Sequence, residues 1–408
     1  MRTALIIFIL TYVVIAIQNV PRVHISRPAG SLIGAVSMVL FGVLSMEEAC
    51  AAIDFNTILF ILGMMIIAAY LEVSGFFGIA ENYILRKADT PVKLLFLLIF
   101  SAGIFSSLFM NDTVCLMFAP IVLRLAKRAD LAPAPYLIAL ATSSNIGSVM
   151  TVIGNPQNML IGLYSGIPFL EFLRILFPVS LLGLAADFLI IKMIYKKEIN
   201  SRKICIGEAR NTEPAQKELL VVSLSAIAGI LVFLSLGFNP PAVAISFACF
   251  LILAGAARPR KVLEEVDWTL LLLFSGLFIV MKGIEKTGIT GIMFDQVRHF
   301  IYGAKFVQIA GVSWVSALTS NVISNVPAVI LFSNVFSGVA VPQTIWLALA
   351  MSSTLAGNLT IIGSIANIIV FESARDDTQV GFFEYFKVGL PITLVTMAIG
   401  IFVLIWRP

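Results

Sequence analysis

The stretch Ser143–Asn158 reads SSNIGSVMTVIGNPQN, and the stretch Ser352–Asn367, 209 residues further along the chain, reads SSTLAGNLTIIGSIAN. Both stretches lie within long apolar segments. In the same register both carry two serines, a threonine, a glycine and a final asparagine. Glycine and proline inside an apolar helix free backbone carbonyl and amide groups, which asparagine, serine and threonine side chains satisfy or turn towards a ligand. Two such interrupted segments predict a chain made of two related halves.

A second set of matches, 213 residues apart, extends this repeat along the chain. The FLEFLR run at 169–174 aligns with FFEYFK at 382–387, so the matches include charged residues as well as apolar ones. Each half contains an odd number of expected crossings, and the second half is therefore inverted relative to the first, as in many secondary transporters. The other residues that match in this register are Asp54, Gly63, Glu72 and Gly75, with Asp267, Gly276, Glu285 and Gly288.

The composition of the 408-residue chain is that of an integral membrane protein. Apolar residues make up 59% of the sequence and charged residues 12%, where soluble chains carry roughly 25% charged residues. The mean hydropathy is +1.01. A soluble fold of this size could not hide so many apolar side chains from water. The same numbers exclude a disordered chain and a nucleic-acid-binding protein, and four scattered cysteines indicate neither a disulfide framework nor a metal site.

The apolar segments predict an all-α polytopic fold with about ten transmembrane helices. Two further apolar stretches, 92–123 and 306–340, are interrupted by Asn111-Asp112-Thr113 and by Ser324-Asn325-Val326-Pro327. Irregular backbone at membrane depth persists only inside protein or beside a water-filled cavity, so we expect both to be re-entrant hairpins. The expected crossings lie at roughly 3–20, 29–46, 55–71, 134–165, 168–195, 218–236, 241–257, 268–281, 343–371 and 385–406.

The repeat also predicts how the chain is divided. We expect an integral plasma-membrane (inner-membrane) protein with its amino terminus outside, because this orientation puts 20 of the 27 Lys and Arg residues on the inside. The predicted parts are a first repeat at 1–195, a cytoplasmic linker at 196–217 and an inverted second repeat at 218–408. Within them we expect scaffold helices at about 1–75, and a transport hairpin with a broken helix at about 92–165 and again at about 306–371.

Polar residues gather at the two hairpin tips and at the two broken segments, which predicts one substrate or ion site between them. For a single serine or threonine, packing between helices is the favoured interpretation. Asn111, Asn145 and Gly147 together form a candidate Na⁺ site. The full set of candidate binding residues is Asn111, Asp112, Thr113, Ser144, Asn145, Gly147, Asn155, Asn158, Ser324, Asn325, Thr354, Asn358, Ser364 and Asn367.

Asp112 is the only ionisable residue between Lys93 and Arg124. A carboxylate at mid-membrane costs roughly 2.5–3.5 kcal/mol on insertion scales, which favours binding and release of a proton or Na⁺ over a helix-capping role. Asp187 is a second intramembrane acid, and its place on an expected scaffold helix favours a structural role. Cys115 lies one turn after Asp112, where a small packed residue is the simpler interpretation.

The FMNDTVC run at Phe109–Cys115, the stretch at 143–158 and GSIAN at Gly363–Asn367 resemble the ion transporter superfamily. This superfamily includes arsenite-pump permeases, silicon-efflux transporters, D-type Na⁺/H⁺ antiporters and divalent-anion/Na⁺ symporters. The arsenite and silicon branch resembles the chain most, since the Ser-Asn-Thr tips of the dicarboxylate symporters are only partly present. The resemblance implies an elevator-like transporter with a rigid, often dimeric scaffold and a mobile transport domain.

The charge pattern distinguishes among the superfamily's substrates. Residues 131–170 and 306–371 contain no charged side chain, so these segments offer a dicarboxylate no basic partner. A neutral weak oxoacid, arsenite or silicic acid, needs only hydroxyl and amide partners. We therefore expect efflux of such a solute coupled to inward H⁺ movement. A Na⁺/H⁺ antiporter or a Na⁺-coupled anion symporter is the alternative.

We expect a transporter rather than an enzyme, because no HExxH run occurs and the two histidines, His24 and His299, fall in expected loops. The sequence predicts no cofactor beyond Na⁺ or H⁺ as the coupling ion. The expected partners are the lipid bilayer, a small inorganic solute and a second copy of the chain, and no nucleic acid.

Overall fold

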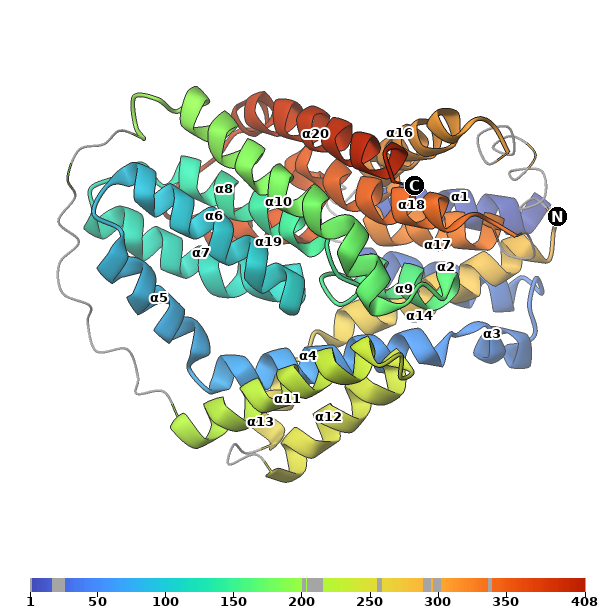
Figure 1. Cartoon of the computed structure of the whole chain (residues 1–408). Coiled ribbons are helices and arrows are strands. Elements are labelled where there is room, and N and C mark those ends of the chain that lie inside the picture. Colours follow the sequence, from blue (N-terminus) through green and yellow to red (C-terminus); the bar gives the residue numbers. More distant parts are fainter. Residues whose placement is uncertain are drawn as a thin grey trace.

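The computed structural model describes residues 2–16, 26–199, 203, 216–254, 259–288, 295, 302–336 and 340–407. Every regular element within these residues is a helix, and most of the helices lie along a common direction (Figure 1). The prediction of an all-α fold is therefore confirmed. The expected linker at 196–217 lies largely outside the described residues, and His24 and His299 lie outside them too.

The first half of the chain contains ten helices in the described residues. They are α1 (Arg2–Ala16), α2 (Arg27–Leu40), α3 (Met46–Ala52), α4 (Phe55–Val73), α5 (Phe76–Lys87), α6 (Pro91–Leu108), α7 (Asn111–Arg128), α8 (Ala134–Ser148), α9 (Pro156–Ser165) and α10 (Phe169–Ile194). The second half contains α11 (Lys217–Ser235), α12 (Pro240–Ala254), α13 (Pro259–Glu264), α14 (Trp268–Glu285), α16 (Lys305–Ile323), α17 (Asn325–Phe336), α18 (Gln343–Leu355), the 3₁₀ turns η1 (Ala356–Asn358) and η2 (Ile361–Gly363), α19 (Ile365–Ser373) and α20 (Phe382–Ile405).

Seven of the described helices are long and apolar enough to cross a membrane, namely α4, α6, α10, α11, α14, α16 and α20. The crossings expected at 3–20, 29–46 and 241–257 correspond to the shorter apolar helices α1, α2 and α12. The crossings expected at 134–165 and 343–371 are each divided into two helices by an irregular stretch. Helices α3, α5 and α13 are additional elements that the apolar segments did not predict.

Both expected hairpins are pairs of contacting helices joined by a very short turn. Only Phe109 and Met110 separate α6 from α7, and only Ser324 separates α16 from α17. The predicted interruptions therefore lie at the hairpin tips, where Asn111 and Asn325 begin α7 and α17. That each hairpin enters and leaves the membrane on the same side stays a prediction.

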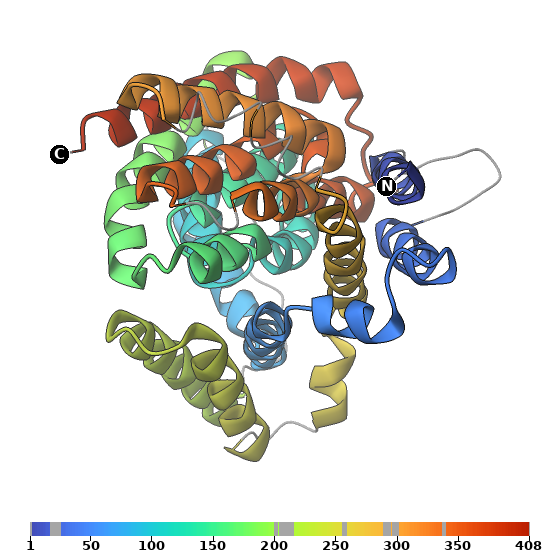
Figure 2. The ribbon, with the colours of Figure 1, turned by 90° about the vertical axis from the view of Figure 1, so that its right-hand side faces the viewer.

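Helices of the two halves cross at two equivalent places, where α4 packs against α12 and α14 packs against α2 (Figure 2). A Cβ atom on Gly63 of α4 would lie 2.7 Å from the carbonyl carbon of Ala244 on α12. A Cβ atom on Gly276 of α14 would lie 2.7 Å from the carbonyl carbon of Ser31 on α2. Gly276 follows Gly63, and Ala244 follows Ser31, by the same 213 residues as the sequence matches. Each half therefore supplies a glycine that lets a helix of the other half approach closely.

We expect Gly63→Ala to destabilise the protein by about 1–3 kcal/mol, because the added methyl group meets backbone that cannot rotate away. Gly381→Ala is the matched control: no atom lies within 4 Å of the added methyl group, and the change should stay within about 0.5 kcal/mol. Thermal unfolding of the two variants in detergent measures the difference. Equal unfolding temperatures would show that the α4–α12 crossing is looser than these distances indicate.

Helices α10 and α20 pack against each other and against the broken helices, with α10 also contacting α6. Helices α11 and α12 lie on the opposite side of the molecule from α16 and α20 (Figures 1 and 2). Helix α10, which carries Asp187, packs with the hairpin and the broken helix of the first half, and its expected place in the scaffold stays a prediction. The division into scaffold and transport parts itself stays a prediction.

Ion pairs between distant segments agree with the expected sidedness. Lys286 binds Glu48 at 2.7 Å and Arg407 binds Glu171 at 2.7 Å, and all four residues fall on the expected outside. Arg124 binds Glu81 at 2.7 Å on the expected inside. The hydrogen bond from Lys286 holds the pKa of Glu48 below its usual value, so this contact stabilises the fold above the ordinary pKa of a glutamate and is lost as the pH falls.

Candidate functional site

Four helix amino termini meet at one small cavity. Asn111 begins α7, Pro156 begins α9, Asn325 begins α17 and Ile365 begins α19, and all four residues line a cavity of about 20 Å³. This volume holds roughly one water molecule, so the site is nearly closed in this conformation. The other lining residues are Asp112, Gln157, Leu270, Ser324, Val326 and Ser364.

The convergence of helix amino termini sets the chemistry of the cavity. Each terminus carries a partial positive charge and backbone N–H groups with no partner inside the helix, which together attract anions and hydroxyl oxygens. Asn111 has already used its own N–H group, which donates to the carbonyl of Gly154 at 2.9 Å and ties the hairpin tip to the break. The cavity is therefore built to accept oxygen atoms of a ligand.

Asp112 is the single ionisable side chain among the residues that line the cavity. It lies in the first turn of α7 and is partly exposed. Arg27 and Asp267 are the charged groups within electrostatic reach of its carboxylate. A carboxylate at this place offsets part of the positive potential of the helix termini. The site therefore has one group that can gain or lose a proton beside the ligand.

Asn145 of α8 is the centre of a buried amide network behind the cavity. Its side-chain oxygen accepts hydrogen bonds from the amide of Asn111 at 3.0 Å and from the hydroxyl of Ser364 at 3.1 Å. Its side-chain nitrogen donates to the oxygens of Asn358 at 2.9 Å and Asn367 at 3.0 Å. One fully buried side chain therefore connects the first hairpin tip to both broken segments.

Asn158 and Asn367 hold the two broken helices in the same way. The amide of Asn158 donates to the carbonyls of Ser148 and Thr151, at 3.1 and 3.0 Å. The amide of Asn367 donates to the carbonyls of Gly357 and Thr360, at 2.7 and 3.0 Å. Both sets span ten and seven residues of sequence, so these asparagines satisfy carbonyls that the breaks leave without helical partners. Their positions favour a structural role over direct ligand binding.

The structure separates the fourteen predicted site residues into two groups. Those that line the cavity are Asn111, Asp112, Ser324, Asn325 and Ser364. The others lie around the cavity, where they bond to backbone or to one another or pack against neighbouring helices. They are Thr113, Ser144, Asn145, Gly147, Asn155, Asn158, Thr354, Asn358 and Asn367. Gln157 was not among the predicted residues, although it lines the cavity and donates to Thr354 at 3.2 Å. Its place directly after the proline that begins α9 was the available signal.

The three groups of the candidate Na⁺ site do not form an open set of oxygen ligands. The side-chain oxygen of Asn111 has no hydrogen-bond partner among the described residues, whereas that of Asn145 already accepts two hydrogen bonds, one of them from Asn111. The carbonyl of Gly147 accepts from the backbone N–H of Met150. A Cβ atom on Gly147 would lie 2.1 Å from the carbonyl oxygen of Gly103, so this glycine serves the close contact of α8 with α6. These residues fit a Na⁺ ion poorly in this conformation.

Arg27 is a site neighbour that the sequence analysis missed. It is the first residue of α2, and its guanidinium group donates to the carbonyl of Ile362, 335 residues away, at 3.2 Å. Ile362 belongs to η2, inside the second break. The crossings expected at 3–20 and 29–46 leave Arg27 in a short loop on the inside, but its side chain reaches the broken segment. A basic group therefore lies close to a site whose own segments contain none.

Ser324 holds the second hairpin tip in a backbone conformation that favours glycine. Its φ and ψ angles are 78° and 159°, a region in which a side chain costs about 1–3 kcal/mol. The residue lines the cavity and is 8% exposed. Strain of this kind persists only where the surrounding structure imposes it, and it is concentrated at functional sites.

We expect Ser324→Gly to raise the unfolding temperature, because the relieved strain exceeds the roughly 0.5–1 kcal/mol that glycine costs in chain entropy. Ser225→Gly, at an exposed position within α11, should instead lower it, since glycine costs roughly 0.5–1 kcal/mol in a helix. Differential scanning fluorimetry compares the two. If both variants lose stability, the backbone at Ser324 is not strained.

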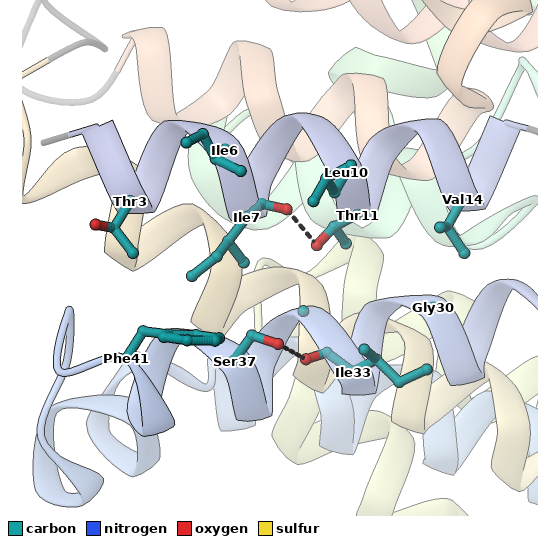
Figure 3. A pocket seen from close by; sticks show the side chains of 11 residues that line it. Thr3, Ile6, Ile7, Leu10, Thr11, Val14, Gly30, Ile33, Ser37 and Phe41 are labelled. Carbon is teal, nitrogen blue, oxygen red and sulfur yellow. Dashed lines mark hydrogen bonds between the residues drawn. The ribbon is translucent and has the colours of Figure 1, made fainter.

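Larger pockets elsewhere differ in their lining: one of about 560 Å³ is lined by Glu171, Arg174 and Arg407, and Arg407 is already paired with Glu171 at 2.7 Å. A pocket of about 380 Å³ between α1 and α2 is lined mainly by aliphatic side chains (Figure 3). The hydroxyls of Thr11 and Ser37 donate to the carbonyls of Ile7 and Ile33 on their own helices, each at 2.7 Å. Such walls suit a lipid chain rather than a hydrated solute. The small cavity at the helix termini is therefore the candidate functional site.

A bundle of apolar helices with two hairpins, two broken helices and a polar cavity where their amino termini meet defines a membrane transporter. Residues 6–351 match the citrate transporter family (CitMHS), and the chain belongs to this family. The resemblance to the ion transporter superfamily is thereby confirmed.

Similar proteins cover nearly the whole chain. The silicon efflux transporter LSI3 of Oryza sativa subsp. japonica is 31% identical, over 94% of this chain and 93% of its own length. The transporter arsB of Dictyostelium discoideum is 26% identical, over 97% and 91%. The crystal structure of the YdaH transporter of Alcanivorax borkumensis has a TM-score of 0.60 at 14% identity, covering 99% of this chain and 96% of that one. This last similarity concerns the fold alone.

Proposed function

We propose that the protein exports a small weak oxoacid, arsenite or silicic acid, in exchange for protons that move inwards across the plasma membrane. The supporting observation is the cavity itself, in which four helix amino termini and several amide and hydroxyl groups surround one carboxylate. The similarity to a silicon efflux transporter, at 31% identity, points to the same class of solute.

The chemistry of a neutral oxoacid fits these groups. Its oxygens accept hydrogen bonds from backbone N–H groups and from the amides of Asn325 and Gln157, and its hydroxyls donate to Asp112. A proton on Asp112 replaces the carboxylate by a neutral carboxyl group, whose carbonyl oxygen accepts a weaker hydrogen bond from such a hydroxyl. Proton binding and solute binding therefore oppose each other at one carboxyl group, which favours exchange of the solute for a proton.

The solute requires more room than the present cavity of about 20 Å³ offers. We propose that the hairpin tips, at Asn111 and Ser324, move apart to admit it. We further propose that hairpins and broken helices move as one body against α4 and α14, and that two copies of the chain associate through the scaffold helices.

An anion symporter is the second candidate, and Arg27 is the observation that favours it. The Arg27 guanidinium group and the helix amino termini give the site a positive character that suits a carboxylate ligand. The family also takes its description from citrate transport. The two candidates differ in whether the ligand is charged when it binds.

Transport by purified protein in lipid vesicles distinguishes these functions. We expect arsenite or silicic acid to move against its gradient when a pH gradient is imposed, and not when a Na⁺ gradient alone is imposed. Succinate and citrate serve as the charged solutes in parallel vesicles. Uptake of citrate or succinate driven by Na⁺, without movement of either weak acid, would refute the proposal in favour of the symporter.

Arg27→Gln tests the charge of the ligand directly. For a neutral solute we expect binding to change less than about threefold, whereas loss of a guanidinium partner should weaken a carboxylate ligand at least about tenfold, or 1.4 kcal/mol. Arg86→Gln, at the exposed end of α5, is the control and should leave the binding of both the neutral solute and the carboxylate ligand unchanged. Isothermal titration with silicic acid and with citrate provides the comparison.

A further inference from the structure

Asp187 is a second acidic side chain within the helix bundle, on the opposite side of the amide network from the cavity. It lies about two turns before the end of α10, is fully buried, and neither of its carboxylate oxygens has a hydrogen-bond partner among the described residues. Gly183 and Ser180 lie one and two turns earlier on the same face, and both contact Ile146 of α8. Asp187 therefore faces α8 one turn further along, where Thr142 lies beside it.

The surroundings of Asp187 contain hydroxyl groups and no opposite charge. Gly183 of α10 lies close to Thr396 of α20. Since these helices run in opposite directions, Thr393 lies one turn from Thr396 on the side of Asp187. The hydroxyl oxygen of Thr393 is also buried without a partner. Two unpartnered polar groups thus lie in one interface between three packed helices.

The helices around α10 bring no basic group to this position. Tyr385 of α20 is the titratable side chain within electrostatic reach of Asp187. Helices α8 and α18 contain no charged residue. Lys93 of α6 lies in the first helical turn and pairs with Asp89, while Lys217 and Glu218 lie in the exposed first turn of α11. An ionised carboxylate here would have no partner charge, and the hydroxyl of Thr142 beside it already donates to the carbonyl of Ile138 at 2.9 Å, so such burial is very unfavourable.

A chain of polar contacts connects this position to the cavity. The carbonyl of Thr142 accepts from the amide of Asn358 at 3.4 Å. Asn358 in turn accepts from Asn145 at 2.9 Å, and Asn145 accepts from Asn111 at 3.0 Å. Asn111 is the neighbour of Asp112 in sequence. Because these dipoles lie in a low-dielectric interior, a change of charge at one end alters the energy at the other.

We propose that Asp187 is a second proton-binding site of the transport cycle, coupled to Asp112 through the amides of Asn111, Asn145 and Asn358. The step is simple protonation: the carboxylate takes one H⁺ on one side of the membrane and releases it on the other, and no other bond changes. This inference rests on the proposed exchange of a solute for protons. It adds that two protons, not one, move for each neutral solute.

The number of protons sets the steepest solute gradient that a given pH gradient sustains. With one pH unit across the membrane and the potential clamped at zero, one proton per solute sustains about a tenfold gradient and two protons about a 100-fold gradient. We expect the wild-type protein to reach the larger limit and Asp187→Asn to reach only the smaller one. Asp89→Asn, the same change at an exposed site, should behave as wild type.

Infrared spectroscopy of the solute-free protein tests the proton on Asp187 independently of transport. The C=O stretching band of a protonated carboxyl should be present in wild type, in Asp112→Asn and in Asp89→Asn, and its Asp187 component should be missing in Asp187→Asn. An unchanged spectrum in Asp187→Asn would overturn the inference. So would an unchanged solute limit in Asp187→Asn, since the acid would then be structural.

Thr393→Val provides a check on folding. It removes the neighbouring unpartnered hydroxyl without removing a titratable group, so it should keep the Asp187 band and the 100-fold limit. If Asp187→Asn does not fold, a Thr393→Val variant with the tenfold limit would equally overturn the inference. If no weak oxoacid is transported by wild type while the Asp187 band is present in wild type and missing in Asp187→Asn, the proposed solute is wrong and the proton site stands.

Discussion

Asp112→Asn is expected to abolish solute movement against a gradient while leaving solute binding intact. Asparagine keeps the size and the hydrogen-bonding reach of the side chain but cannot gain or lose a proton. The four helix amino termini and the amides of Asn325 and Gln157 still line the cavity and can still donate hydrogen bonds to the solute's oxygens. Binding without proton exchange permits only passive exchange of solute between the two sides.

The measurement compares three properties in the same vesicles: pH-driven uptake, solute counterflow and solute-induced thermal stabilisation. We expect the first to fall to background and the other two to persist. Asp89→Asn, at an exposed loop position paired with Lys93, controls for the substitution itself. Normal pumping by Asp112→Asn would reduce Asp112 to a helix cap, whereas loss of binding together with pumping would show that the charged carboxylate itself is required to hold the solute or Na⁺.

Asn145→Ala should cause the largest loss of stability and of transport among substitutions of the amide residues. The change leaves buried groups of Asn111, Ser364, Asn358 and Asn367 without the partner that each now has. A buried polar group without its partner costs about 1–3 kcal/mol, so the expected loss is several kcal/mol. The hairpin tip and both breaks would also lose their common connection, which should abolish transport even in the folded fraction.

Chemical unfolding in detergent and transport in vesicles measure the two effects. Asn56→Ala is the matched control, because Asn56 is exposed in the first turn of α4. This substitution should change the free energy of unfolding by less than about 0.5 kcal/mol. A change in protein fluorescence when solute is added to Asn145→Ala would show that the cavity still binds it. Stability within 1 kcal/mol of wild type would mean that water replaces the amide.

Much of the architecture was readable from the sequence, because it depends on local composition. Apolar length predicted the helices, and glycine, proline and asparagine within apolar runs predicted the positions of the breaks and tips. The register of 213 residues predicted that Gly63 and Gly276 are equivalent, and the structure places each against a helix of the other half. Asn111, Asp112, Ser324, Asn325 and Ser364 were all predicted as site residues and line the cavity.

The choice of partners was decided by the tertiary structure. No local pattern tells that Arg27 reaches Ile362, that Asn145 rather than Asn158 connects the parts, or that α10 packs against α8 and leaves Asp187 buried without a hydrogen bond. Residue type and spacing determine which backbone groups a helix exposes at its ends. Which of those ends meet at one cavity depends on the packing of segments hundreds of residues apart. That packing is decided by side-chain volumes and close backbone contacts, which exist only in the folded protein.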